Sequence, residues 1–256
     1  MFDLIAHRGV SKEAPENTLI AFKKAIELEV DFIELDVHLT KDGVPVVIHD
    51  ALLGRTTNGD KARKVIETYL KDLSNLDAGQ WFAPQFQGEK IPTLDEVLAL
   101  PRGNTGLMIE IKKGFSPPKQ IAQAVSNSVQ NAQNAQGIYV GSFSPIILED
   151  LRLLMDNISL IGILEDASLL PNYSTMGLNH LAIWHKLLHP QMIEELHAER
   201  MKVWTFTVDD LPTVEFLLSI GVDGIITNDP RSLVNVRNRL KTKESSDQAS
   251  RKNPRT

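Results

Sequence analysis

The chain contains no cysteine. This absence excludes a disulfide framework, a thiolate metal site and a cysteine nucleophile. Long apolar runs are also missing, since no stretch approaches the roughly 18 continuous apolar residues of a membrane-spanning helix. The N-terminal sequence has no basic segment followed by a long apolar run, so we expect no secretory signal. These absences predict a cytoplasmic protein without stable membrane insertion.

An excess of positive charge is missing as well. The chain has 27 Lys and Arg residues against 33 Asp and Glu residues, which gives a net charge of −6. Residues 241–256 hold five of the basic and two of the acidic residues, so the remainder carries about −9. Such a chain is a poor candidate for binding nucleic acid or an anionic membrane, because both require a basic face. An anionic substrate would therefore need local Arg or Lys side chains or a metal ion.

The length of 256 residues allows one barrel-sized domain, and the hydrophobic pattern favours it. Short apolar runs alternate with amphipathic segments through about eight βα units, which predicts a closed (β/α)8 TIM barrel within one domain, residues 1–240. An irregular polar stretch covers residues 51–92. Residues 241–256 are polar and aperiodic, so we expect a disordered basic tail. Strands are expected at 3–6, 32–37, 44–48, 107–111, 138–141, 160–164, 181–184, 203–206 and 224–227.

Carboxylates follow two of these expected strands. Glu34 and Asp36 are two residues apart, so in a strand both side chains lie on the same face. Glu110 closes the strand at 107–111. Converging buried carboxylates repel each other, and a divalent cation with a preference for oxygen ligands, Mg²⁺ or Ca²⁺, would relieve this repulsion. The spacing leaves an alternative open, in which these acids face solvent or pair with Arg8 and Lys112.

Histidines also stand at strand ends. His7 and His49 each follow an apolar run and precede a polar loop, so they are candidates for general acid and base catalysis near neutral pH. His38 shares the parity of Glu34 and Asp36, and either an inward position or a place in the following loop fits the pattern. Arg8 and Lys112 supply the positive charge that a phosphate ester would need. No P-loop or dinucleotide-binding glycine pattern is present.

An ordered set of motifs resembles the glycerophosphodiester phosphodiesterase family. It runs from about residue 3 to 240, and the order makes the match specific. The main motifs are HRG (7–9), PENT (15–18), DFIELDV (31–37), TKDG (40–43), VVIHD (46–50), IEIK (109–112), VWT (203–205) and GVDGIIT (221–227).

The resemblance implies a (β/α)8 barrel with a small insertion, about residues 51–105, beside the active site. It implies metal-dependent hydrolysis of glycerophosphodiesters, such as glycerophosphocholine and glycerophosphoethanolamine, to sn-glycerol 3-phosphate and an alcohol. Residue by residue, it assigns acid–base catalysis to His7 and His49, Mg²⁺ or Ca²⁺ binding to Glu34, Asp36 and Glu110, phosphate binding to Arg8 and Lys112, and glycerol packing to Trp204.

Three positions depart from the family pattern. Val30 replaces the usual glycine, Met108 the usual asparagine, and Asn228 the usual acid after the last strand. None of them removes an expected ligand or acid–base group. The nucleophile, either water or the substrate's 2-hydroxyl, stays open, and so does the assignment of His7 as base and His49 as acid.

Two other functions remain open from the sequence. A lysophospholipase D would need an apolar entrance, for which Trp81, Phe82 and Phe86 are the candidates in the irregular stretch. A catalytically inactive barrel that binds phosphodiesters is the other alternative, and the intact set of expected catalytic and metal-binding residues argues against it.

Overall fold

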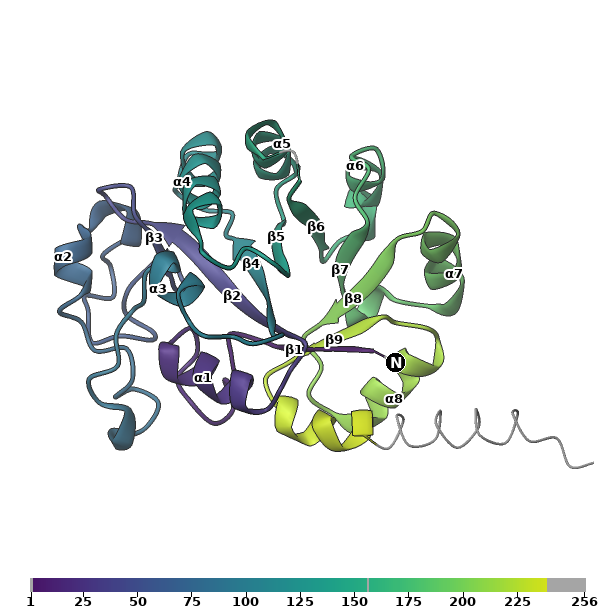
Figure 1. Cartoon of the computed structure of the whole chain (residues 1–256), viewed down its shortest axis with the longest axis horizontal. Helices are drawn as coiled ribbons and strands as arrows, with labels where there is room; N and C mark the ends of the chain where they lie inside the picture. The colour runs from purple at the N-terminus through teal and green to yellow at the C-terminus, as the bar shows by residue number, and fades with distance from the viewer. Residues whose placement is uncertain (1, 156, 239–256) are drawn as a thin grey trace, which may run out of the picture.

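The computed structural model describes residues 2–155 and 157–238 and shows a closed barrel of eight parallel strands surrounded by helices (Figure 1). Strand β1 pairs with both β2 and β9, which closes the ring. The expected (β/α)8 barrel is therefore confirmed. The barrel strands are β1 (Asp3–Ala6), β2 (Phe32–Leu39), β4 (Gly106–Ile111), β5 (Ile138–Ser142), β6 (Ser159–Leu164), β7 (His180–Trp184), β8 (Lys202–Phe206) and β9 (Gly224–Thr227).

Helices follow the barrel strands and form the outer layer in Figure 1. Thr18 caps α1 by accepting a hydrogen bond from the amide of Ala21, and Asp210 caps α8 in the same way from Thr213. A further helix runs from residue 230 to 238, where the described part of the chain ends. The helices are α1 (Leu19–Glu27), α3 (Leu94–Leu98), α4 (Pro118–Asn131), α5 (Pro145–Leu154), α6 (Leu170–Ser174), α7 (Pro190–Ala198) and α8 (Leu211–Ser219).

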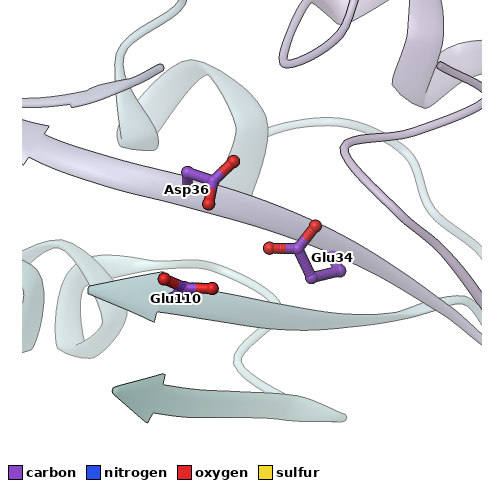
Figure 2. Close-up of side chains that lie close together, drawn as sticks. All are labelled: Glu34, Asp36 and Glu110. Carbon is purple, nitrogen blue, oxygen red and sulfur yellow. The ribbon is translucent and has the colours of Figure 1, made fainter. Parts of the chain in front are cut away.

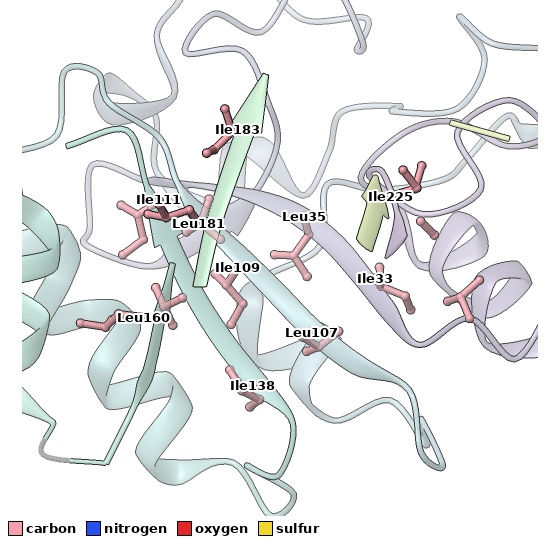
Figure 3. Close-up of a cluster of buried hydrophobic side chains, with 14 of the residues drawn as sticks. Ile33, Leu35, Leu107, Ile109, Ile111, Ile138, Leu160, Leu181, Ile183 and Ile225 are labelled. Atoms are coloured by element: carbon pink, nitrogen blue, oxygen red, sulfur yellow. The ribbon is translucent and has the colours of Figure 1, made fainter. Parts of the chain in front are cut away.

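The strands have two different faces because side chains alternate along a strand. One face packs against the helices through a large apolar cluster that includes Ile33, Leu35, Leu107 and Ile109 (Figure 3). The other face fills the barrel with a smaller cluster that includes Met108, and it also carries the acidic residues of β2 and β4. The outward face of the strands thus forms the main hydrophobic core, and the acidic part of the inward face is available for a catalytic site.

The expected third extended segment is strand β3 (Pro45–Val47), and it lies outside the ring. It pairs antiparallel with β2, so it forms a hairpin and not a βα unit. The chain that follows includes η1 (Val65–Glu67), α2 (Leu70–Leu73) and η2 (Pro84–Phe86), and it occupies the left of Figure 1. This segment has a small core of its own, made of Val46, Ile48, Leu53, Val65, Leu73, Ala78 and Ile91.

Two further expectations concern the tail and the membrane. The basic tail at 241–256 lies outside the described residues. Within the described ranges, no helix combines the length and the hydrophobicity that crossing a bilayer requires.

Candidate active site

Three carboxylates converge on one face of the neighbouring strands β2 and β4. Glu34 and Asp36 project from β2, and Glu110 projects from β4, where it stands in register with Asp36 (Figure 2). One oxygen from each residue lies within 4.8 Å of the other two. All three residues are buried, with exposed fractions of 2%, 1% and 8%. The structure therefore brings together the three expected metal ligands.

Cations compensate only one of these carboxylates fully. Asp36 lies 3.1 Å from Arg8 Nε and 3.4 Å from Lys112 Nζ. Burial alone would raise the pKa of Asp36, but Lys112 and Arg8 outweigh burial and hold this pKa well below its usual range. Lys112 also pairs with Glu110, 2.6 Å from its Oε1.

At Glu34 and Glu110 the neighbouring cations do not offset the effect of burial, so ionisation of both carboxyl groups is disfavoured. Burial, followed by repulsion from Asp36 and Glu110, raises the pKa of Glu34 well above its usual value. Burial raises the pKa of Glu110 to about 7, although Lys112 opposes the shift. Oε1 of Glu34 is buried with no hydrogen-bond partner, and Oε1 of Glu110 has only the Lys112 ammonium nearby. An all-oxygen cluster with unused acceptors suits a hard divalent cation.

Backbone geometry after β1 fixes two of the carboxylates. Arg8 and Asn17 have φ values of 55° and 58°, a left-handed conformation that non-glycine residues adopt rarely. The Arg8 amide donates to Glu34 Oε2 at 2.9 Å. The Asn17 side chain donates to Asp36 Oδ2 at 2.8 Å, while Thr18 caps the helix. Asn17 thus supports the acidic cluster.

His7 lies at the inner edge of the acidic cluster. Its Nε2 is 3.9 Å from Glu34 Oε2, and its Nδ1 is 2.7 Å from Asn228 Oδ1. Burial, assisted by repulsion from Arg8, lowers the pKa of His7 to about 4. The imidazole is therefore neutral near pH 7 and able to accept a proton.

His49 has a different orienting partner. Its Nδ1 lies 2.7 Å from Asp50 Oδ1, and Arg55 binds the same Asp50 carboxylate. His38 is buried and faces inward, and its Nε2 lies 3.0 Å from the His49 carbonyl oxygen. His38 therefore supports the backbone of His49, which decides between the two positions that the sequence left open.

A cavity of about 620 Å³ opens over these groups. Both histidines, Arg8, Lys112 and Glu110 line it, and Glu34 and Asp36 cluster with Glu110. The structure therefore brings seven of the eight expected site residues to one place. Two aromatic rings, one directly after β5 and one at the end of β8, and two acids that follow β6 also line the cavity. The lining residues beyond the first five are Lys113, Phe143, Glu165, Asp166, Leu169, Phe206 and Thr207.

Trp204 is the exception. It is 1% exposed, and its Nε1 donates to Asp3 Oδ2 at the start of β1, at the amino-terminal end of the barrel. Its ring packs against Phe32 and Tyr139. The placement on glycerol is thus corrected, because strand parity fixes the inward face but not the depth. Phe206, two residues further along β8, lines the cavity instead.

The aromatic residues of the insertion do not form an entrance to this cavity. Trp81, Phe82 and Phe86 stack edge to face on one another, with ring centroids 5.7 and 5.6 Å apart. None of the three lines the cavity. The feature that a lysophospholipase D would need is therefore not built from these residues.

Sequence reasoning missed several functional neighbours. Phe206 shares parity with Trp204 on β8, so counting two residues onward would have found it. Asp50 ends the VVIHD motif, but nothing in the sequence indicates its contact with Arg55. Asn228 is 221 residues from His7, and only the closure of the barrel brings them together.

Comparisons with known proteins agree with this geometry. The family model described as "Glycerophosphoryl diester phosphodiesterase family" matches residues 7–232. A glycerophosphodiester phosphodiesterase of Caldanaerobacter subterraneus subsp. tengcongensis is 38% identical over 91% of this chain and 96% of its own. One from Bacillus altitudinis is 33% identical over 94% and 100%.

Solved phosphodiesterase structures are similar to this chain as well. An Oleispira antarctica phosphodiesterase in complex with the product sn-glycerol-3-phosphate superposes with a TM-score of 0.87 at 28% identity. The match covers 92% of this chain and 96% of that one. A glycerophosphodiester phosphodiesterase from Agrobacterium tumefaciens has a TM-score of 0.76 at 28% identity and covers 92% and 100%.

Proposed function

Because the chain belongs to the glycerophosphoryl diester phosphodiesterase family and is an enzyme of that type, we propose the following reaction. The enzyme hydrolyses glycerophosphodiesters with small head groups, such as glycerophosphocholine and glycerophosphoethanolamine, to sn-glycerol 3-phosphate and a free alcohol. The observation that carries the proposal is one cavity lined by two histidines, two cationic side chains and Glu110, which clusters with the carboxylates of Glu34 and Asp36. Its volume of about 620 Å³ accommodates a substrate of this size.

Arg8 and Lys112 hold the phosphodiester in this proposal. Both are fixed before substrate arrives, because each pairs with Asp36 and Arg8 also pairs with Glu16 at 2.8 Å. The Arg8 fork and the Lys112 point charge then neutralise the charge that builds on the phosphoryl oxygens. Preorganised charges of this kind need little rearrangement during the reaction.

Glu34, Asp36 and Glu110 would hold Mg²⁺ or Ca²⁺. The fit rests on the unused buried oxygen of Glu34 and on the pKa values of Glu34 and Glu110, which burial raises. When bound, a divalent cation supplies Lewis-acid stabilisation of a phosphoryl oxygen. Arg8 orients Glu34 through its backbone amide, and Asn17 orients Asp36, so the ligand oxygens are already placed.

His7 and His49 move the protons. His7 Nε2 takes the proton of the attacking oxygen, from water or from the glycerol 2-hydroxyl. His49 gives a proton to the departing alcohol oxygen, and the adjacent Asp50 carboxylate stabilises the charged imidazole before this transfer. If the 2-hydroxyl attacks, water then opens the cyclic phosphate.

The first experiment measures sn-glycerol 3-phosphate released from glycerophosphocholine and glycerophosphoethanolamine with Mg²⁺, Ca²⁺ or EDTA. His7→Ala and His49→Ala should each lose at least about 100-fold in kcat. His197→Ala is the matched control, because His197 lies on α7 and pairs with Asp223 on the outside of the barrel. No metal-dependent release from folded wild-type protein would reject the proposal.

A second substrate separates the two histidines. The p-nitrophenyl ester of glycerol 3-phosphate has a leaving group that needs no proton. His49→Ala should recover most of its activity on this ester, whereas His7→Ala should not. The reverse pattern would exchange the two roles. Lysophosphatidylcholine, tested in the same assay, should be a poor substrate, and its preference over glycerophosphocholine would favour the lysophospholipase D alternative.

A further inference from the structure

Asn228 is the hydrogen-bond partner of His7, and it is itself held by a carboxylate. Its Nδ2 donates to Asp209 Oδ2 at 2.7 Å, and its backbone amide donates to Asp209 Oδ1 at 2.8 Å. The Thr227 hydroxyl also donates to Asp209 Oδ1, at 2.9 Å. Three donors therefore fix both oxygens of Asp209.

These contacts determine which end of the Asn228 amide faces His7. A carboxylate can only accept hydrogen bonds, so the group facing Asp209 must be the NH2 of Asn228. The carbonyl Oδ1 must then face His7 Nδ1, 2.7 Å away. The Ser11 hydroxyl lies 2.9 Å from this Oδ1 and 2.8 Å from the His7 carbonyl oxygen. Its single proton can go to either oxygen, so the orientation of the Asn228 side chain is set by Asp209 and not by Ser11.

An acceptor opposite Nδ1 requires His7 to carry its proton on Nδ1. The competing tautomer, with the proton on Nε2, has only the Glu34 carboxylate 3.9 Å away, too far for a hydrogen bond. The Nδ1–H tautomer leaves a lone pair on Nε2, the nitrogen that points toward the acidic cluster. A proton on Nε2 would prevent this nitrogen from accepting another.

We propose that Asp209 and Asn228 are positioning residues that lock the catalytic tautomer of His7. Asp209 fixes the Asn228 amide, and Asn228 fixes the imidazole. The proposal rests on the role of His7 in the function proposed above, but the tautomer itself can be observed without turnover.

Asp209→Asn is the sharpest test, because it keeps the size of the side chain and changes only its hydrogen bonding. In this variant the Thr227 hydroxyl and the backbone amide of Asn228 still donate to the one side-chain oxygen that remains at residue 209. The new NH2 group therefore faces the side chain of Asn228. The side-chain amide of Asn228 then flips, so that its oxygen accepts from residue 209 and its NH2 group faces His7 Nδ1. This arrangement favours the Nε2–H tautomer of His7. Asp210→Asn is the matched control, since Asp210 only caps α8 and asparagine caps equally well.

The first readout is the ¹⁵N chemical shifts of the His7 ring, measured in metal-free protein at about pH 8, where histidine is neutral. The His7→Ala variant assigns these signals. The second readout is the kinetics of the metal-loaded enzyme. We expect Nδ1–H in the wild type and in Asp210→Asn, and Nε2–H in Asp209→Asn. The kcat of Asp209→Asn should fall about 10- to 100-fold, with KM changed less than about twofold, as for a misoriented catalytic histidine.

Two results would overturn the proposal: an Nε2–H tautomer in the wild type, or an Asp209→Asn variant that matches Asp210→Asn in both readouts. If Asp209→Asn does not fold, Asn228→Ala replaces it and should give a mixture of tautomers with a similar loss of kcat. An inactive wild type with the Nδ1–H tautomer would reject the proposed function and leave the lock intact.

Discussion

Arg55 and Asp50 form a two-bond ion pair across the mouth of the barrel. Arg55 Nε lies 2.6 Å from Asp50 Oδ2, and Arg55 Nη2 lies 2.9 Å from Oδ1, the oxygen that holds His49. The same guanidinium binds both oxygens of Glu16, at 2.7 and 2.9 Å. Burial of Asp50 opposes ionisation, but Arg55 and His49 hold its pKa at about 2. The irregular segment after β3 thereby orients a candidate catalytic group.

Replacing Arg55 should therefore impair proton donation. We expect Arg55→Met to lower kcat on glycerophosphocholine about tenfold, because Asp50 loses the partner that holds it against His49. The loss should be smaller on the p-nitrophenyl ester. Arg63→Met is the control, since Arg63 is equally exposed in the same segment but pairs with Asp72. Equal kinetics for the two variants would contradict a clamp on His49.

The pKa of Glu110 predicts how the metal-free protein responds to pH. Folding raises this pKa from 4.5 to about 7, so between these values the folded chain holds a proton that the unfolded chain has lost. Protonated Glu110 therefore contributes its full stabilisation to the free energy of unfolding below about pH 4.5, and this stabilisation is lost as the pH rises through about 7.

Urea unfolding in EDTA from about pH 4.5 to 7.5 measures this effect. The wild type should lose stability relative to Glu110→Gln as the pH rises, by up to about 1.4 kcal/mol per pH unit. Saturating Mg²⁺ or Ca²⁺ should oppose the loss, because the cation binds the ionised carboxylates. If the free energies of unfolding of the wild type and Glu110→Gln depend on pH in the same way in EDTA, Glu110 does not titrate in this range.

The two inward aromatic residues of β8 should separate stability from substrate binding. Trp204→Phe removes the hydrogen bond to Asp3 and some buried volume, so we expect the free energy of unfolding to fall by about 2 kcal/mol, with little change in KM. Phe206→Leu should instead raise KM about three- to tenfold, because Phe206 lines the cavity. Unfolding curves and steady-state kinetics on both variants measure this contrast, and a raised KM in Trp204→Phe would restore Trp204 to the substrate site.

The sequence by itself determined the barrel and most of the residues at its mouth. The period of a strand is two residues, so Glu34 and Asp36 had to share a face, and parallel strands had to present His7, Glu110 and Lys112 at one end. His49 follows the antiparallel strand β3, so this rule does not place it. Alternation of apolar runs and amphipathic segments was enough to predict a closed ring. These features are local or follow from the general rules of α/β folds.

Only the tertiary structure decided depth, register and long-range partners. Periodicity gives Trp204 its inward face but not its height in the barrel, which depends on the register of β8 against β9. The pairing of Asp36 with Glu110 and the contact of His7 with Asn228 depend on how separate strands align. Such contacts join residues far apart in the chain, and no local pattern records them. Strand β3 shows the same limit, since its extended sequence did not reveal that it pairs antiparallel, outside the ring.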